Sequence, residues 1–318
     1  MSNWDKRYAE RVGLLVEILP ALAIEPRFAL KGGTAINLFE RDLPRLSVDI
    51  DLTWLPCGEF AEDSSLIAEG LSALADALRA APLHLQVQAS AAQGAQVNRI
   101  IASRGRARVQ IETSPVMRGV VHPVRTMTVQ PSVEAEFGFA EVQVLHFADL
   151  YAGKLAATVS RQHPRDLFDM EPLLERDQLD AELWRTFLVY LTGSPKPAAD
   201  MLAPGEPQDF AEIFDAHFRG MTATPTSADE LLAIRARLLR KMAALLDDAS
   251  CRFLLSVERE APDFTLIGLP QAATLPAIRR KLDNLNARSD KKREADYRKL
   301  EETLARLQRD GVAHRGNT

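Results

Sequence analysis

Two aspartates alternate with apolar residues in the run SVDIDL, residues 47–52. Side chains alternate faces along a strand, so Asp49 and Asp51 project together on one side of it. Two ionised carboxylates this close repel each other, and a divalent cation between them relieves the repulsion. Their hard oxygen ligands suit Mg2+, with manganese as the alternative ion. An edge strand with its polar face in water explains the same pattern, so both interpretations stay open from these residues alone.

A third acid, Glu112, ends another alternating stretch, residues 108–113, in which Val109 and Ile111 face one way and Glu112 the other. If the two strands are neighbours, Glu112 joins the aspartates. It then completes the metal site or serves as the general base for an attacking hydroxyl.

The stretch KGGT, residues 31–34, stands before a short apolar helix. Glycines let the backbone come close to a ligand, and the free amides of a helix start attract phosphate. Thr34 caps the helix or gives its hydroxyl to the phosphate. A tight turn is the alternative for these residues alone, but together with the aspartates they predict a phosphate cradle beside a metal, as nucleotidyl transfer requires.

A lysine interrupts a helix that is otherwise apolar nearly all round, residues 147–159, where Asp149 is the other charged residue. Such a helix is expected to be buried. Lys154 therefore either extends to a nearby surface or binds nucleotide phosphates and offsets their charge in the transition state.

The run RDLFD, residues 165–169, follows Pro164. A helix start favours one acid, which explains one of the two aspartates. We expect one of Asp166 and Asp169 to face the site, where it orients the nucleotide or accepts a proton, and Arg165 to pair with an acid or a phosphate. The sequence leaves open which aspartate does so.

The chain has 318 residues, of which 46% are hydrophobic and 26% charged, as in a soluble globular protein. Apolar residues recur with a period of two before residue 147 and with a helical period after it. We predict an α+β fold in which a core with a mixed sheet and flanking helices, which carries the predicted phosphate and metal site, occupies residues 1–147. A helical domain, residues 148–318, is expected to follow and to complete the active-site cleft.

Several other features exclude classes of site. No signal sequence or membrane-length apolar stretch is apparent, which predicts a cytoplasmic protein without a membrane partner. Cys57 and Cys251 lie far apart in the sequence. This separation argues against a disulfide scaffold and against a thiolate metal site. The six histidines show no paired ligand spacing, so each is expected to be structural or exposed.

The net charge of -5 excludes one basic field over the whole molecule. Locally, residues 83–111 contain no acid, and residues 279–318 hold 12 Lys and Arg against 7 Asp and Glu. Such stretches are solvated faces or hold an RNA backbone. The arginines of the first stretch are Arg99, Arg104, Arg106 and Arg108.

The sequence resembles the DNA polymerase β-type nucleotidyltransferases, in particular the AbiEii/MenT toxins of toxin–antitoxin systems. The resemblance lies in KGGT, the following Asn37-Leu38-Phe39 and then SVDIDL. Lys154 and the RDLFD run resemble later motifs of that family. Residues 253–256 and 275–284 resemble its C-terminal helical region, so the resemblance covers most of the chain.

The resemblance implies an NTP-dependent nucleotidyltransferase that adds NMP to an acceptor, a tRNA 3' end, and so inhibits growth until a cognate antitoxin encoded nearby counters it. It implies one or two Mg2+ ions. It implies that Asp49, Asp51 and Glu112 bind the metal. The nucleotide would be bound by Lys31, Gly32, Gly33, Thr34, Lys154 and Arg165. The catalytic residues would be the three metal-binding acids together with Lys154, Asp166 and Asp169. The alternatives are modification of a protein hydroxyl or a small molecule, and a non-catalytic nucleotide-binding module.

Overall fold

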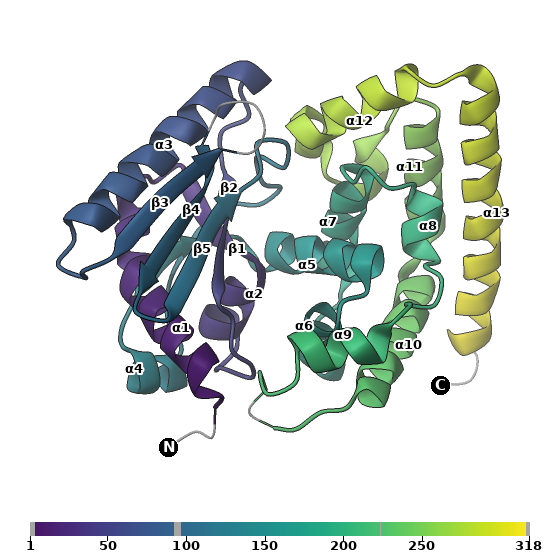
Figure 1. Ribbon diagram of the computed structural model, residues 1–318. Coiled ribbons are helices and arrows are strands. Elements are labelled where there is room, and N and C mark those ends of the chain that lie inside the picture. The colour runs from purple at the N-terminus through teal and green to yellow at the C-terminus, as the bar shows by residue number, and fades with distance from the viewer. Residues whose placement is uncertain (1–3, 92–96, 223, 316–318) are drawn as a thin grey trace. The chain divides into compact units, whose positions relative to one another are not determined.

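The computed structural model describes residues 4–91, 97–222 and 224–315. The chain divides into two compact units (Figure 1). The first unit holds Met1–Leu150 and Arg219–Pro225, and the second holds Tyr151–Phe218 and Thr226–Thr318. The domain boundary at residue 147 stays a prediction.

The first unit contains a mixed sheet whose seven strands, in the described part of the chain, lie in the order β3-β4-β5-β2-β1-β7-β6. β2 runs parallel to β5 and β1 parallel to β7, while the other neighbours are antiparallel. The strands are β1 (Phe28–Lys31), β2 (Asp49–Trp54), β3 (Gln86–Ala91), β4 (Val97–Arg104), β5 (Ala107–Thr113), β6 (Arg125–Thr128) and β7 (Glu141–Val144).

Helices pack on this sheet, α1 along β5 and α3 along β3 and β4 (Figure 1). The alternate residues Ile50, Leu52, Val109 and Ile111 of the two central strands are completely buried. Alternation therefore leaves the acids of the same strands for the opposite face. The helical segments of this unit are α1 (Lys6–Ile18), a 3-10 segment (Leu19–Ile24), α2 (Gly32–Ala35), a π-helical segment (Ile36–Glu40), α3 (Phe60–Ala80) and α4 (Pro131–Phe137).

The regular elements among the described residues of the second unit are all helices, and its helix α10 packs against α6 and α13. The mixed sheet and the helical half confirm the predicted fold class. The helices are α5 (Phe147–Arg161), which begins in the first unit, α6 (Pro164–Glu175), α7 (Ala181–Thr192), α8 (Ala198–Leu202), α9 (Phe210–His217), α10 (Ala228–Leu245), α11 (Asp248–Glu258), α12 (Pro276–Asn286) and α13 (Asp290–Arg315), with 3-10 segments Phe264–Ile267 and Pro270–Thr274.

Some element bounds differ from the sequence pattern. The first helix ends at Ile18, and Pro20 falls in the 3-10 segment that follows it. β2 begins at Asp49, so Ser47 and Val48 of the SVDIDL run precede the strand. β6 and α4 were not predicted, since β6 is four residues long and its alternation runs only between half-buried and exposed positions.

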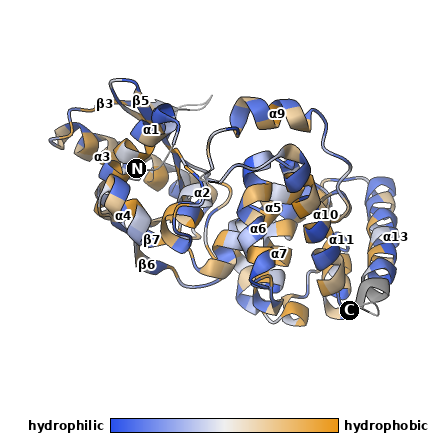
Figure 2. Cartoon of the chain, turned by 90° about the horizontal axis from the view of Figure 1, so that it is seen from below, coloured by the Kyte–Doolittle hydropathy of each residue, from blue (hydrophilic) through white to orange (hydrophobic). Residues whose placement is uncertain are grey.

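Helix α13 is hydrophilic over most of its length (Figure 2). Its apolar stripe is nevertheless used within the second unit, because Leu300 and Leu304 are buried and the helix packs on α10 and α11. Among the described residues, no helix has the length and apolar character that crossing a membrane requires.

Substitution of Gly311 tests the close packing of α13 on α10. A Cβ at this position would lie 2.4 Å from the carbonyl oxygen of Ala243. Gly→Ala inside a helix normally stabilises by about 1 kcal/mol. Because backbone blocks this Cβ, we expect Gly311→Ala to destabilise the protein by about 1–2 kcal/mol instead. Thermal unfolding measures it. Gly205→Ala, whose Cβ meets open space, is the control, and equal melting temperatures for the two variants would contradict the prediction.

Candidate active site

Four charged residues form a row across four consecutive strands of the sheet. The register pairs Lys31 of β1 with Asp51 of β2, Asp51 with Glu112 of β5, and Glu112 with Arg99 of β4. Residues directly opposite each other on neighbouring strands project on the same side. Two carboxylates therefore stand side by side between two cations, and the condition for Glu112 to join the aspartates, that their strands are neighbours, is met.

The acids are half open to solvent rather than buried. The side chains of Asp49 and Glu112 are each 40% exposed, so water weakens their repulsion. The guanidinium of Arg11 lies 3.5 Å from Asp49, and that of Arg99 lies 3.4 Å from Glu112. The edge-strand alternative is wrong, because β2 lies inside the sheet between β5 and β1.

The ammonium of Lys31 responds to the same acids. Burial lowers the pKa of Lys31, while the charges of Asp51 and Glu112 act in the opposite direction and raise it. Burial prevails, so the pKa of Lys31 lies below its ordinary value.

Gly32 and Gly33 lie where a Cβ would collide with neighbouring side chains of the same chain. Gly32 has a φ of +74°, and a Cβ there would lie 2.3 Å from a carboxylate oxygen of Asp51. A Cβ at Gly33 would lie 2.7 Å from the guanidinium of Arg45 and 2.9 Å from the hydroxyl of Ser47. Close approach to a ligand was the expected reason for glycine, and the structure adds close approach to Asp51, Arg45 and Ser47. Phosphate binding here stays a prediction.

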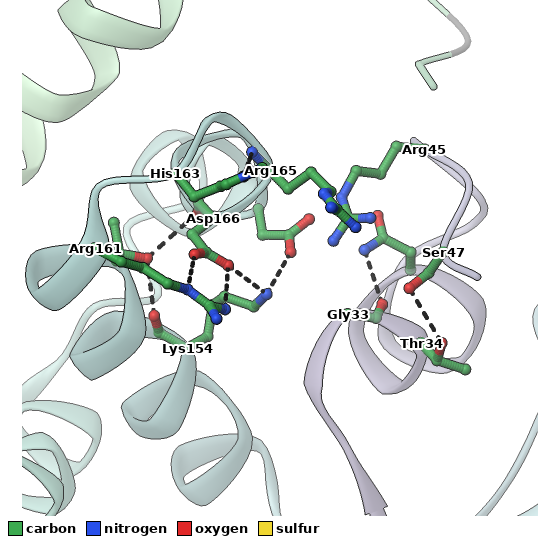
Figure 3. A network of polar contacts seen from close by, with 12 residues as sticks. Gly33, Thr34, Arg45, Ser47, Lys154, Arg161, His163, Arg165 and Asp166 are labelled. Atoms are coloured by element: carbon green, nitrogen blue, oxygen red, sulfur yellow. Dashed lines mark hydrogen bonds and ion pairs between the residues drawn. The ribbon is translucent and has the colours of Figure 1, made fainter. Parts of the chain in front are cut away.

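Thr34 connects the glycine turn to β2. Thr34 is completely buried, and its hydroxyl donates to the carbonyl oxygen of Asp49 at 2.6 Å. The same hydroxyl lies 3.1 Å from the hydroxyl of Ser47 (Figure 3). Asn37 donates to the carbonyl oxygen of Gly33 at 2.9 Å. Thr34 therefore fixes the start of the strand that carries Asp49, and no side chain caps α2.

Sequence reasoning missed Arg45 and Ser47, which are both buried beside Gly33. Arg45 donates to the carbonyl oxygen of Leu46 at 2.9 Å. The available signal was a charged residue inside the apolar run that leads into β2, since such a residue rarely enters a core without a purpose.

In the second unit, Lys154 is held by both aspartates of the RDLFD run. Its ammonium lies 3.1 Å from Asp166 and 2.9 Å from Asp169, and all three side chains are at most 6% exposed. The surface-directed alternative for Lys154 is wrong. Arg161, which is 63% exposed, adds a bond to Asp166 at 2.7 Å (Figure 3). With the partly exposed Arg161, two cations face two anions in this group.

The pKa of Asp166 shows which force dominates in this group. Burial alone would raise it, but the charges of Lys154 and Arg161 and their hydrogen bonds outweigh burial and hold the pKa well below its ordinary value. Asp166 and Asp169 both bind the lysine, so neither one is set apart by its contact with Lys154. Their catalytic roles and that of Arg165 stay predictions.

His163 caps α6, a function that the sequence did not indicate. Its Nδ1 accepts a hydrogen bond from the backbone N–H of Arg165 at 3.2 Å, which requires the neutral ring. Burial lowers the pKa of His163 to about 4, and the charge of Arg165 acts in the same direction.

Acids from outside each basic stretch neutralise part of its charge. Arg104 binds Glu17 at 2.7 Å, and Arg99 binds Glu112, while residues 92–96 of the first stretch lie outside the described residues. In the C-terminal stretch, Arg293 binds Glu260 and Lys299 binds Asp200, whereas Arg288, Lys292 and Arg298 bind acids of the stretch itself.

Comparisons with known proteins agree with the resemblance seen in the sequence. A family model described as Nucleotidyl transferase AbiEii toxin, Type IV TA system, matches residues 13–310. Among solved structures, MenT4, a nucleotidyltransferase toxin from Mycobacterium tuberculosis H37Rv, matches with a TM-score of 0.58 and 17% sequence identity. The match covers 88% of this chain and 92% of that chain, and it shows a shared fold. A search of curated proteins finds no match.

The contact of Gly32 with Asp51 can be tested by adding one methyl group. Gly32→Ala must adopt a positive φ and displace the Asp51 carboxylate, so we expect a loss of about 2–4 kcal/mol in the free energy of unfolding. Gly105→Ala is the control, because Gly105 has a φ of +60° but open space around its Cβ. Denaturant unfolding measures both, and equal losses would show that Asp51 imposes no constraint.

Acid stability tests the His163 cap. The unfolded chain, with an ordinary histidine pKa of 6.5, takes up a proton that the folded protein resists down to about pH 4. Stability from this group is therefore complete above pH 6.5 and falls as the pH drops through that window. His163→Asn keeps a capping oxygen without titrating. We expect denaturant unfolding between about pH 7 and pH 4 to show a smaller loss in the variant, and parallel curves would contradict this.

Proposed function

Because this chain belongs to the AbiEii family of nucleotidyltransferase toxins, we propose that it transfers a nucleoside monophosphate from an NTP to the 3' end of a tRNA. The observation that carries the proposal is the pairing of Asp51 with Glu112 on neighbouring strands, with Asp49 one pleat away. Paired carboxylates on one sheet face are an arrangement that holds a metal-bound triphosphate.

The donor set fits a hard divalent cation. Asp49, Asp51 and Glu112 offer only oxygen, and half-exposed carboxylates leave room for the waters that Mg2+ retains. We propose that these three residues hold one or two Mg2+ ions. Bound there, the metal would supply charge neutralisation for the triphosphate and activation of the attacking hydroxyl.

The chain's own groups would then position the NTP. The backbone of Gly32 and Gly33, with Lys31 beside it, would hold the outer phosphates, and Thr34 would keep that turn fixed to β2. The acceptor hydroxyl would attack the α-phosphorus. A new P–O bond forms as the bond to the β-phosphate oxygen breaks, and pyrophosphate leaves. If Glu112 does not hold the metal, it would accept the proton of the attacking hydroxyl; if it does, the proton would pass to solvent.

Arg11 and Arg99 already provide positive charge for Asp49 and Glu112. We propose that they release these carboxylates when metal binds and turn to the phosphates of the NTP or the acceptor. Both side chains are partly exposed, so such a change of partner does not require opening a core.

Phosphate binding by Lys154 is a separate part of the proposal. Asp166 and Asp169 already hold its ammonium, so a phosphate would have to compete with two carboxylates. Arg161 can keep Asp166 paired during that exchange, since it binds the same carboxylate at 2.7 Å.

The biological part of the proposal follows the family. Addition of nucleotides to tRNA 3' ends would block aminoacylation and arrest growth in the cytoplasm, and a cognate antitoxin would counter it. The rival acceptors are a protein hydroxyl and a small molecule, which the same metal chemistry would serve.

Expression of the wild type beside Asp49→Asn and Asp51→Asn, with sequencing of tRNA 3' ends, tests the reaction. We expect added nucleotides and growth arrest with the wild type, and a loss of about 100-fold or more in transfer with either variant, because the charge that holds the metal is removed. Asp76→Asn is the matched control, an exposed aspartate on α3.

Purified protein with labelled NTPs, incubated with total tRNA or with cell protein, separates the acceptors. Label on protein alone would refute the tRNA proposal. Full growth arrest by Asp49→Asn would refute catalysis as the toxic activity.

A further inference from the structure

In the first unit, one histidine, His122, lies close to a second histidine and an aspartate, His146 and Asp149, that follow it by more than twenty residues. One ligand atom from each of His122, His146 and Asp149 lies within 4.8 Å of the other two. The two imidazole rings are tilted by 32° with centroids 4.9 Å apart. Asp149 is completely buried, and both histidines are partly exposed.

Asp149 is held firmly in place. One carboxylate oxygen accepts the backbone N–H of Val121 at 2.8 Å, and the other accepts the backbone N–H of His122 at 2.9 Å. These two bonds fix the orientation of the carboxylate. Carboxylates that bind metals are commonly supported in this way.

The two segments that carry the histidines are each anchored separately. His146 directly precedes α5, and its Nδ1 accepts the N–H of Ala148 at 3.3 Å, a long hydrogen bond. His122 follows a segment fixed by Arg118, whose guanidinium lies 3.0 Å from the buried Asp63, and by the N–H of Gly119, which donates to Trp54. The cluster therefore connects the loop between β5 and β6 with the start of α5.

We propose that His122, His146 and Asp149 bind a divalent transition-metal ion of the zinc class. Two imidazole nitrogens and one carboxylate oxygen are the ligands that such ions prefer, and they disfavour magnesium. Ligand atoms around one zinc ion stand about 3.3 Å apart, so a contraction of about 1.5 Å or less, by rotation of the partly exposed rings, closes the site.

The bound ion is a clamp between the loop and α5. Water fills its fourth position, and the backbone amides of Val121 and His122 support the carboxylate ligand. Binding displaces the weak bond from Ala148 if Nδ1 of His146 is the ligand atom. The site shares no residue with the acids of β2 and β5, so its occupancy does not depend on the proposed nucleotidyl transfer.

Calorimetric titration of the untagged protein with zinc chloride tests the site. The Asp49→Asn/Asp51→Asn protein serves as the parent, because it lacks the charge that would draw zinc to the other acids. We expect one equivalent to bind, and His122→Ala and His146→Ala each to weaken the affinity at least about 100-fold. His84→Asn removes an exposed histidine at positive φ and is the matched control.

Cobalt(II) in place of zinc gives a second readout, since a site of low coordination number yields a visible absorption band that both His variants should lose. Melting temperatures without metal establish that the variants fold. Zinc should raise the melting temperature of the parent and of His84→Asn but not of the folded His122→Ala protein. Absence of zinc binding in the parent, or unchanged binding in His122→Ala and His146→Ala, would overturn the proposal.

Discussion

The repulsion between two carboxylates on neighbouring strands is the constraint around which the first unit is organised. Asp51 and Glu112 are directly paired, and the sheet places a cation at each end of their row. Lys31 and Arg99 are those cations. Partial exposure to water reduces the remaining cost, so the site can exist before a metal or a nucleotide arrives.

Local backbone features in the glycine turn follow from the same constraint. Gly32 lacks a side chain where the carboxylate of Asp51 lies, and the hydroxyl of Thr34 holds the carbonyl of Asp49. Glycine at this position, which the motif explains by close approach of a ligand, is thus also needed to make room for the carboxylate of Asp51. Both uses require a small residue at the same place, which explains why one motif can satisfy them together.

The second unit solves a similar charge problem in a dry environment. Lys154 lies between Asp166 and Asp169, all three almost completely buried, and removal of Lys154 would leave two buried carboxylates without its charge. The acids of the sheet are partly exposed to water, whereas Lys154 and its two aspartates are almost completely shielded from it.

Features that depend on local periodicity and on motifs could be predicted from the sequence alone. They include the common side of Asp49 and Asp51 on a strand, the buried helix around Lys154 and the family. The pairing of Glu112 with Asp51 and the proximity of His122 to His146 became visible only in the folded chain. Strand register and contacts between distant segments set these proximities, and a periodic pattern within one segment contains no information about which segment lies beside it.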